Sequence, residues 1–222
     1  MNGSTTMPQN GDKIDLQSET DVLLIIDVQN DFCPGGALAV PQGDEVVPVI
    51  NGLSTRFNHV VLTQDWHTPG HQSFASSHDG KDPFQTAHLP YGEQVLWPDH
   101  CVQGTPGANF HADLQTDRAQ MVIRKGFRPQ MDSYSAFYEN DHMTATGLTG
   151  YLRQRGAKRL FLVGLATDFC VLYSALDARH ARFETYVIDD ACRAIDLEGS
   201  LAQAHAAMER EGVHRITSEA LL

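Results

Sequence analysis

The chain has 222 residues, a length that suits one large α/β domain, and its hydrophobic fraction of 41% is ordinary for a protein with a buried core. Its formal net charge of −12, without a run of Lys or Arg, argues against binding to nucleic acids or anionic membranes. No segment is apolar for long enough to predict a membrane-spanning helix.

Residues 1–20 are polar and lack the basic-then-apolar pattern of a signal peptide, so we expect a flexible leader on a cytoplasmic protein. A single domain is expected over residues 21–222. The cysteines are far apart and form no CxxC pair, which predicts free thiols in a reducing compartment. They are Cys33, Cys101, Cys170 and Cys192.

Strand-like and helical segments alternate along this domain. The predicted strands cover residues 22–28, 60–63, 121–125, 160–163, 185–188 and 214–217. The predicted helices cover residues 44–57, 144–155, 168–182 and 198–211. This order predicts an α/β fold with three αβα layers, in which a mostly parallel six-stranded sheet is flanked by helices.

Residues 66–118 interrupt the alternation with a long insertion that is rich in histidine and proline. The insertion follows the second predicted strand, and open α/β sheets bind ligands at the carboxyl ends of their strands. Long loops inside a domain are usually functional. We therefore expect this insertion to carry part of a metal- and substrate-binding site.

Cys170 is a candidate nucleophile. The fourth predicted strand ends near Gly164, and Thr167 with Asp168 is typical of a helix N-cap, so Cys170 is expected in the first helical turn. The helix dipole and the unpaired backbone N–H groups there favour a thiolate and could stabilise an oxyanion. The alternative is a small buried hydrophobic residue, which is common for isolated cysteines.

Asp27 and Lys125 follow the first and third predicted strands, so a parallel sheet brings them to the same edge as Cys170. The carboxylate could take the thiol proton, and the ammonium group could hold the carboxylate in place. Each has a structural alternative, because Asp27 could bind nearby backbone and Lys125 could extend to solvent. Together they predict a site for nucleophilic catalysis.

Asp65, His67 and His100 form a second predicted cluster, with His71 as a further candidate. One carboxylate and two imidazoles suit a divalent metal ion that keeps open coordination positions. A single histidine is otherwise more often exposed or bound to one backbone group. Two nearby aromatic residues, Phe32 and Trp97, could enclose a flat aromatic substrate. Most aromatic side chains otherwise belong to the core.

The chain resembles the nicotinamidases, which are nicotinamide and pyrazinamide amidohydrolases among the isochorismatase-like cysteine hydrolases. The resemblance extends from about Asp21 to the C-terminus. The Asp–Lys–Cys set is typical of the whole superfamily, and the Asp-x-His and Trp-Pro-x-His motifs are typical of the nicotinamidase branch. The matching motifs, in chain order, are residues 27–32, 63–67, 71–75, 97–101, 125–126, 132–135 and 164–171.

This resemblance implies catalytic roles for Asp27, Lys125 and Cys170. It implies an oxyanion hole formed by the backbone N–H groups of Ala166 and Cys170, next to a cis peptide between Leu165 and Ala166. It implies one divalent metal ion, usually zinc and otherwise manganese or iron, bound by Asp65, His67, His100 and, directly or through water, His71. The substrate-binding residues that it implies are Phe32, Trp97, Tyr134 and Phe137.

The expected function is therefore hydrolysis of nicotinamide, and of pyrazinamide, to the acid and ammonia through a cysteine thioester, as a step of NAD salvage. Three alternatives are open. Metal-bound hydroxide could be the nucleophile while Cys170 is structural, the substrate could be a carbamoyl or another heteroaromatic amide, or the chain could be a metal-dependent binding scaffold. The partner expected is a small-molecule substrate, and a homo-oligomer is one arrangement that the sequence leaves open.

Overall fold

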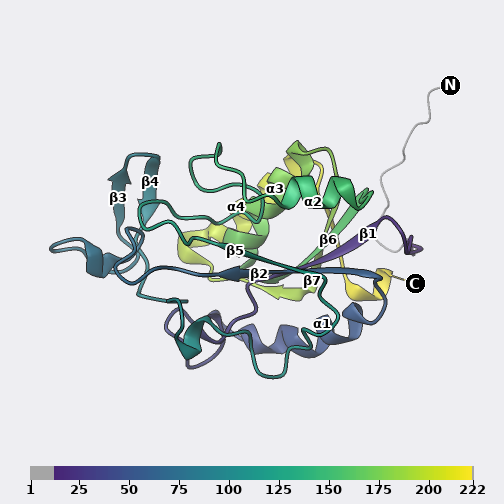
Figure 1. Ribbon diagram of the computed structural model, residues 1–222, viewed down its shortest axis with the longest axis horizontal. Coiled ribbons are helices and arrows are strands. Elements are labelled where there is room, and N and C mark those ends of the chain that lie inside the picture. The colour runs from purple at the N-terminus through teal and green to yellow at the C-terminus, as the bar shows by residue number, and fades with distance from the viewer. Residues whose placement is uncertain (1–12, 222) are drawn as a thin grey trace.

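Six parallel strands form the central sheet of the computed structural model, which describes residues 13–221 (Figure 1). The strand order is β5-β2-β1-β6-β7-β8. The predicted α/β fold is confirmed, and each predicted strand lies in this sheet. The strands are β1 (Asp21–Ile26), β2 (His59–Asp65), β5 (Met121–Lys125), β6 (Arg159–Leu165), β7 (Glu184–Arg193) and β8 (His214–Ile216).

Helices cover both faces of this sheet. The helix α1 (Val46–Ser54) packs on one face, whereas α2 (Leu148–Gln154), α3 (Leu172–His180) and α4 (Ser200–Arg210) lie on the other (Figure 1). Strand β1 is buried along its whole length because its side chains alternate between the two helical layers. A strand buried on both faces shows a continuous apolar run in sequence, and this explains why β1 was predictable.

The helices begin or end at different residues from those predicted. Helix α1 follows a 3-10 turn at Gly43–Glu45, and α2 begins only after Gly147, whose φ of 101° is outside the helical region. The third predicted helix is divided into a π-helical turn over Thr167–Val171 and the α-helix α3. Cys170 therefore lies in an irregular turn before α3, not in the first turn of a regular helix.

The insertion contains a hairpin that the sequence did not predict. Strands β3 (Thr86–Leu89) and β4 (Gly92–Val95) pair in antiparallel fashion and project from the left side of the view in Figure 1. The base of the insertion is bound to the sheet, because the Trp66 N–H donates to the Lys125 carbonyl over 2.9 Å. The hairpin was missed because its strands are short and mostly polar, without a clear apolar alternation.

The expected leader is only partly covered by the structure. Residues 1–12 lie outside the described residues. Ile14 is buried, and its N–H donates to the Ala220 carbonyl over 2.7 Å, so the chain already contacts the domain before β1. The four cysteines are free, as predicted. Over residues 13–221, no helix has the length and apolar character to cross a membrane.

Candidate active site

The site lies where the strand order of the sheet reverses. Strands β1 and β6 are neighbours, and the chain continues from them toward opposite edges of the sheet. This is the position at which open α/β sheets form a crevice beyond the carboxyl ends of their strands. Asp27 follows β1, Asp65 ends β2, Lys125 ends β5 and Cys170 follows β6.

Asp27, Lys125 and Cys170 come together as one buried cluster. The Lys125 Nζ atom lies 2.8 Å from Asp27 Oδ2 and 3.4 Å from Cys170 Sγ. Lys125 also donates to the Ser133 carbonyl and to Asp65 Oδ1, over 2.9 and 3.1 Å. A buried ammonium group with this many acceptors stays charged and fixes the groups around it.

Burial controls the protonation of this cluster. Burial raises the pKa of the Asp27 carboxyl, although Lys125 opposes the shift. Burial also raises the pKa of the Cys170 thiol well above its usual range, because the lowering effect of Lys125 does not outweigh burial and the nearby carboxylates. The resting cluster thus holds a neutral thiol beside a carboxylate of increased basicity, which is an arrangement for proton transfer from sulfur to Asp27.

Two local expectations for the Cys170 turn were wrong. The site does not favour a resting thiolate, because burial and the nearby carboxylates raise the pKa of the Cys170 thiol more than Lys125 lowers it. Thr167 and Asp168 do not cap the helix, and the N-cap position is Ala166. The Asp168 carboxylate instead accepts hydrogen bonds from the backbone N–H of Asp196 over 2.8 Å and from the Ser200 hydroxyl, where α4 begins.

The strand β6 leads into the turn through a cis peptide between Leu165 and Ala166, as the resemblance implied. Gly164 precedes it with a φ of 116°, and a Cβ atom there would lie 2.1 Å from the Ile26 carbonyl oxygen. Glycine is therefore required for the close approach of β6 to β1. Ala166 and Cys170 both line the active-site cleft.

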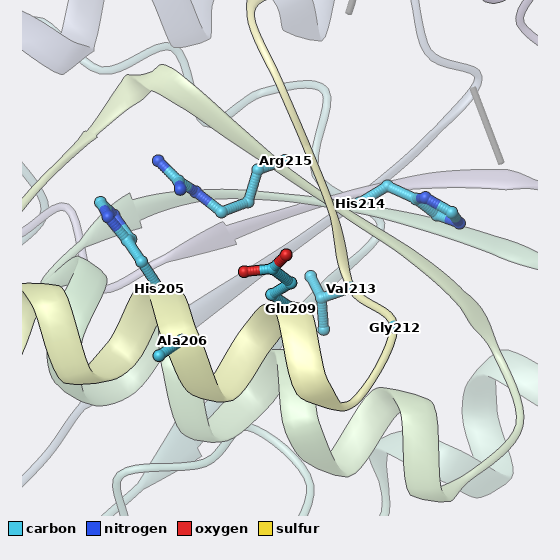
Figure 2. Close-up of a pocket in the computed structure, with 7 residues that line it drawn as sticks. All are labelled: His205, Ala206, Glu209, Gly212, Val213, His214 and Arg215. Atoms are coloured by element: carbon cyan, nitrogen blue, oxygen red, sulfur yellow. The ribbon is translucent and has the colours of Figure 1, made fainter. Parts of the chain in front are cut away.

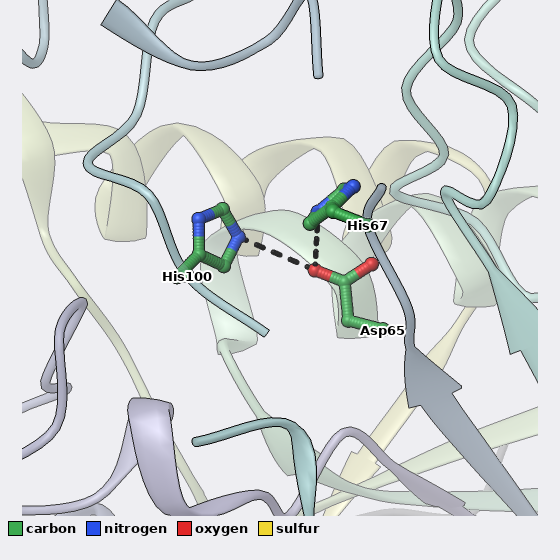
Figure 3. A group of neighbouring side chains, drawn as sticks. All are labelled: Asp65, His67 and His100. Carbon is green, nitrogen blue, oxygen red and sulfur yellow. Dashed lines mark hydrogen bonds and ion pairs between the residues drawn. The ribbon is translucent and has the colours of Figure 1, made fainter. Parts of the chain in front are cut away.

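Asp65, His67 and His100 form a compact second cluster (Figure 3). Their ligand atoms all lie within 4.8 Å of one another, and the two histidine Nε2 atoms lie 2.9 and 3.3 Å from Asp65 Oδ2. The Nδ1 atoms face the carbonyl oxygens of Gly126 and Pro98, over 2.9 and 2.8 Å. Hydrogen bonds to these carbonyls hold the two Nδ1 atoms, so the Nε2 atoms, which are paired with Asp65 here, are the ones that would bind a metal ion. The donor set therefore fits a divalent metal ion.

His71 is not brought into this cluster. Its Nδ1 atom lies 2.8 Å from Ser73 Oγ and its Nε2 atom lies 2.7 Å from the Arg128 carbonyl oxygen. Both ring nitrogens are thus bound to protein groups. The His71 ring instead packs beside His67, with ring centroids 4.5 Å apart, so it supports the position of a ligand histidine.

A narrow cleft joins the two clusters, with a free volume of about 20 Å³ in this structure. Cys170 lines it together with Asp65 and His100, so both clusters face the same cleft. Among the predicted substrate-binding residues, Phe32, Trp97 and Tyr134 line this cleft. The predicted role of Phe137 in substrate binding was wrong, because its side chain is fully buried in the core between the sheet and the helices α2–α4.

The cleft is also lined by four residues that the sequence did not single out for substrate binding: Leu38, Asp132, Phe169 and Ile195. Phe169 and Ile195 could have been suspected, because they follow the carboxyl ends of β6 and β7. Asp132 lies in a motif that carried the resemblance. Leu38 had no signal, because its place depends on how a loop after β1 folds back over the sheet.

A second cavity, of about 440 Å³, lies between α4 and β8 (Figure 2). In Figure 2 the side chains of His205, Glu209 and Arg215 surround the space between the helix and the strand, whereas His214 points to the other side. Arg215 is already paired with Asp189 over 2.7 Å. The residues that line this cavity differ from those of the cleft, so the two are separate sites.

The fold and the cleft define an α/β protein with a buried cysteine next to a set of side chains that could hold a metal ion. The sequence pattern of the isochorismatase domain matches residues 21–220, and the chain belongs to this family.

Characterised relatives and solved structures agree with this assignment. The nicotinamidase of Acinetobacter baylyi is 54% identical over 93% of this chain and 96% of its own length. The structure of an Acinetobacter baumanii nicotinamidase and pyrazinamidase is 56% identical, with a TM-score of 0.91, over 92% of this chain and 99% of that one.

Two further structures contain bound groups. A protein of L. infantum in complex with nicotinate is 41% identical, with a TM-score of 0.83, over 95% of this chain and 98% of that one. A pyrazinamidase of Pyrococcus horikoshii in complex with zinc is 35% identical, with a TM-score of 0.73, over 89% of this chain and 98% of that one.

Proposed function

We propose that this enzyme hydrolyses nicotinamide, and pyrazinamide as a second substrate, to the carboxylic acid and ammonia through a thioester on Cys170. The observation that carries the proposal is the shared cleft. Cys170, 3.4 Å from Lys125, lines the same aromatic cavity as Asp65 and His100 of the metal-binding cluster. Relatives named nicotinamidase over nearly the whole chain support this substrate, and with it a step of NAD salvage.

The reaction begins with proton transfer from the Cys170 thiol to the Asp27 carboxylate. The sulfur then attacks the carboxamide carbon, and the carbonyl electron pair moves to oxygen. Backbone N–H groups of Ala166 and Cys170 are proposed to hold this oxyanion, and such a donor typically lowers a barrier by about 3–4 kcal/mol. The C–N bond breaks as Asp27 returns its proton to nitrogen, so ammonia leaves and the thioester remains.

Hydrolysis of the thioester uses the same carboxylate. Asp27 accepts a proton from an attacking water, the tetrahedral intermediate collapses, and the C–S bond breaks to release the acid and regenerate the Cys170 thiol. Lys125 stays protonated throughout, because burial opposes its charge but Asp27 and Asp65 outweigh this effect and raise its pKa. Its role is to hold Asp27 and to stabilise negative charge on sulfur.

Substrate orientation comes from the rest of the cleft. Phe32 and Trp97 are proposed to enclose the pyridine ring, with Tyr134 as a further wall. Asp65, His67 and His100 would hold one divalent ion, most simply zinc as in the Pyrococcus relative, and His71 would act only by packing on His67. When bound, that ion would supply a Lewis-acid contact for the ring nitrogen.

A coupled ammonia assay on purified protein tests this function. We expect release of ammonia from nicotinamide and pyrazinamide, with much slower release from carbamoyl compounds such as ureidoacrylate, the substrate in the name of a relative that is only 25% identical. Faster turnover of the carbamoyl compound than of nicotinamide would contradict the proposed substrate and indicate a carbamoyl amidase. A lack of turnover with every amide would favour a binding scaffold.

We also propose a cytoplasmic location, because the four free cysteines suit a reducing compartment. Fractionation of cells with an antibody to the untagged protein tests it, and recovery in a secreted or periplasmic fraction would contradict it. Oligomeric state is a separate question, which light scattering of the purified protein answers directly.

A further inference from the structure

Phe84 has an unusual position for a large apolar residue. It lies just before β3, the residue is 45% exposed, and its backbone φ is 71°. This left-handed region suits glycine or asparagine, and bulky side chains rarely adopt it. A local preference would therefore not select phenylalanine here. The side chain must be explained by what its ring contacts.

The ring of Phe84 contacts Trp97. The two rings meet edge to face, with centroids 6.0 Å apart and an interplanar angle of 89°. The backbone fixes this contact, because the Phe84 N–H donates to the Leu96 carbonyl over 2.6 Å and the Leu96 N–H donates to the Gln85 carbonyl over 2.8 Å. Phe84 is thus paired with the residue that directly precedes Trp97 in the chain.

Trp97 is held by other groups inside the cleft. Phe169 packs against its indole edge to face at 4.9 Å, and the indole N–H donates to the Tyr134 hydroxyl over 3.1 Å. Trp97, Phe169 and Tyr134 all line the cleft, whereas Phe84 is not among the lining residues. Phe84 is therefore a contact of the indole that reaches it from the solvent-exposed part of the insertion, outside the cleft.

We propose that Phe84 is a positioning residue for substrate binding, which holds the Trp97 indole against the substrate ring. This inference rests on the function proposed above and adds a residue outside the cleft to it. Phe84 touches none of the reacting groups, so it acts on the stability of the bound substrate and not on the chemical step. Its removal raises KM and leaves kcat close to that of the parent enzyme.

Three substitutions separate the ring from the backbone. Phe84→Ala removes the ring and keeps the strained φ, whereas Phe84→Gly removes the ring and relieves the strain. Both raise KM for nicotinamide about three- to tenfold, which is the affinity equivalent of one aromatic pair. Phe84→Tyr keeps the ring and restores the parent KM. Met143→Ala serves as the control, because Met143 is 83% exposed and lies outside the cleft.

The pattern of KM and melting temperature decides the inference. Phe84→Gly should melt no lower than Phe84→Ala and yet show the same rise in KM, because the lost ring and not the backbone is responsible. An unchanged KM in both variants would overturn the inference. A Phe84→Tyr enzyme as impaired as Phe84→Ala, or an equal fall in kcat in all three, would also overturn it.

Tryptophan fluorescence tests the same contact without turnover. The chain has two tryptophans, so a Trp66→Phe background isolates the emission of Trp97. In that background Phe84→Ala should shift Trp97 emission to longer wavelength and lower its anisotropy, and Phe84→Tyr should not. Unchanged emission and anisotropy would overturn the contact. Failure of the parent enzyme on nicotinamide would reject the proposed function instead, and the fluorescence result would still report on Phe84.

Discussion

At the scale of single residues, the cysteine cluster shows how burial creates reactivity. Asp27, Lys125 and Asp65 are nearly inaccessible to solvent, and charges at such depth persist only when they are paired. The Lys125 ammonium group forms ion pairs with Asp27 over 2.8 Å and with Asp65 over 3.1 Å. It therefore links the cysteine cluster to the metal-binding cluster. Removal of Lys125 would leave two buried carboxylates facing each other without a cation.

Replacement of the nucleophile gives the most direct prediction. Cys170→Ala should lower the rate of ammonia release from nicotinamide by at least about 10⁴-fold, since loss of a nucleophile typically removes most of the catalysis. Folding and metal content should stay near normal, because alanine fits the same buried space. Circular dichroism, metal analysis and the ammonia assay check this. Cys192→Ala, at another buried cysteine, is the matched control. Substantial metal-dependent turnover in Cys170→Ala would support the metallohydrolase alternative.

Labelling by a thiol reagent tests access to the same residue. We expect iodoacetamide to modify Cys170 before Cys33, Cys101 and Cys192, because Cys170 lines the cleft and the other three do not. The pKa of the Cys170 thiol is raised, so its thiolate fraction grows as pH increases and labelling should accelerate throughout the range from pH 7 to 9. Burial also raises the pKa of Cys33 to about 11, so the order of labelling is set by access through the cleft. Peptide mapping that finds another cysteine modified first would contradict the expectation.

At the scale of elements, the carboxyl ends of the strands control the metal-binding cluster. Gly126 directly follows β5 with a φ of 64°, and a Cβ atom there would lie 2.6 Å from the ring of His67. Its carbonyl also accepts the hydrogen bond that orients the same ring. The end of β5 therefore positions a ligand that belongs to a different element.

This contact predicts the effect of one methyl group. Gly126→Ala should displace the His67 ring, lower the bound metal per chain and raise KM for nicotinamide. The matched control is Gly70→Ala, because Gly70 has a similar φ of 69° but open space where the Cβ atom would be. Metal analysis of both proteins after identical purification gives the comparison. Equal metal content in both would show that His67 tolerates the methyl group.

The strands of the sheet were easier to predict from the sequence than the turns and loops that complete the site. The strands of the sheet were predictable because most are buried on both faces and appear as unbroken apolar runs. The turn that holds Cys170 was not predictable, because Asp168 accepts hydrogen bonds from Asp196 and Ser200, which are distant in sequence, and does not cap the helix. The metal-binding motif indicated Asp65, His67 and His100, but the packing of His71 and Phe137 depends on contacts between segments that are far apart in sequence. Pattern alone does not contain that information.

At the scale of the whole molecule, the fold divides the two tasks of the enzyme. The sheet supplies the reacting groups from rigid strand ends, whereas the insertion of residues 66–118 supplies His100 and Trp97. The sheet holds the groups at its strand ends in fixed positions for the reaction. Residues of the insertion can be substituted without altering the sheet. The chemistry and the recognition of the ring should therefore be separable by mutation.

Removal of the metal ligands tests this separation. His67→Ala and His100→Ala should lose metal and raise KM strongly for nicotinamide, because the contact to the ring nitrogen is lost. Benzamide has no ring nitrogen, so it should be a poor substrate of the parent enzyme and lose little more after the same substitutions or after chelation. His88→Ala, at an exposed histidine of β3, is the control. If the metal instead generated the nucleophile, both amides would lose kcat together. Steady-state kinetics on both amides distinguish the two roles, and an equal proportional loss with nicotinamide and benzamide would reject the orienting role.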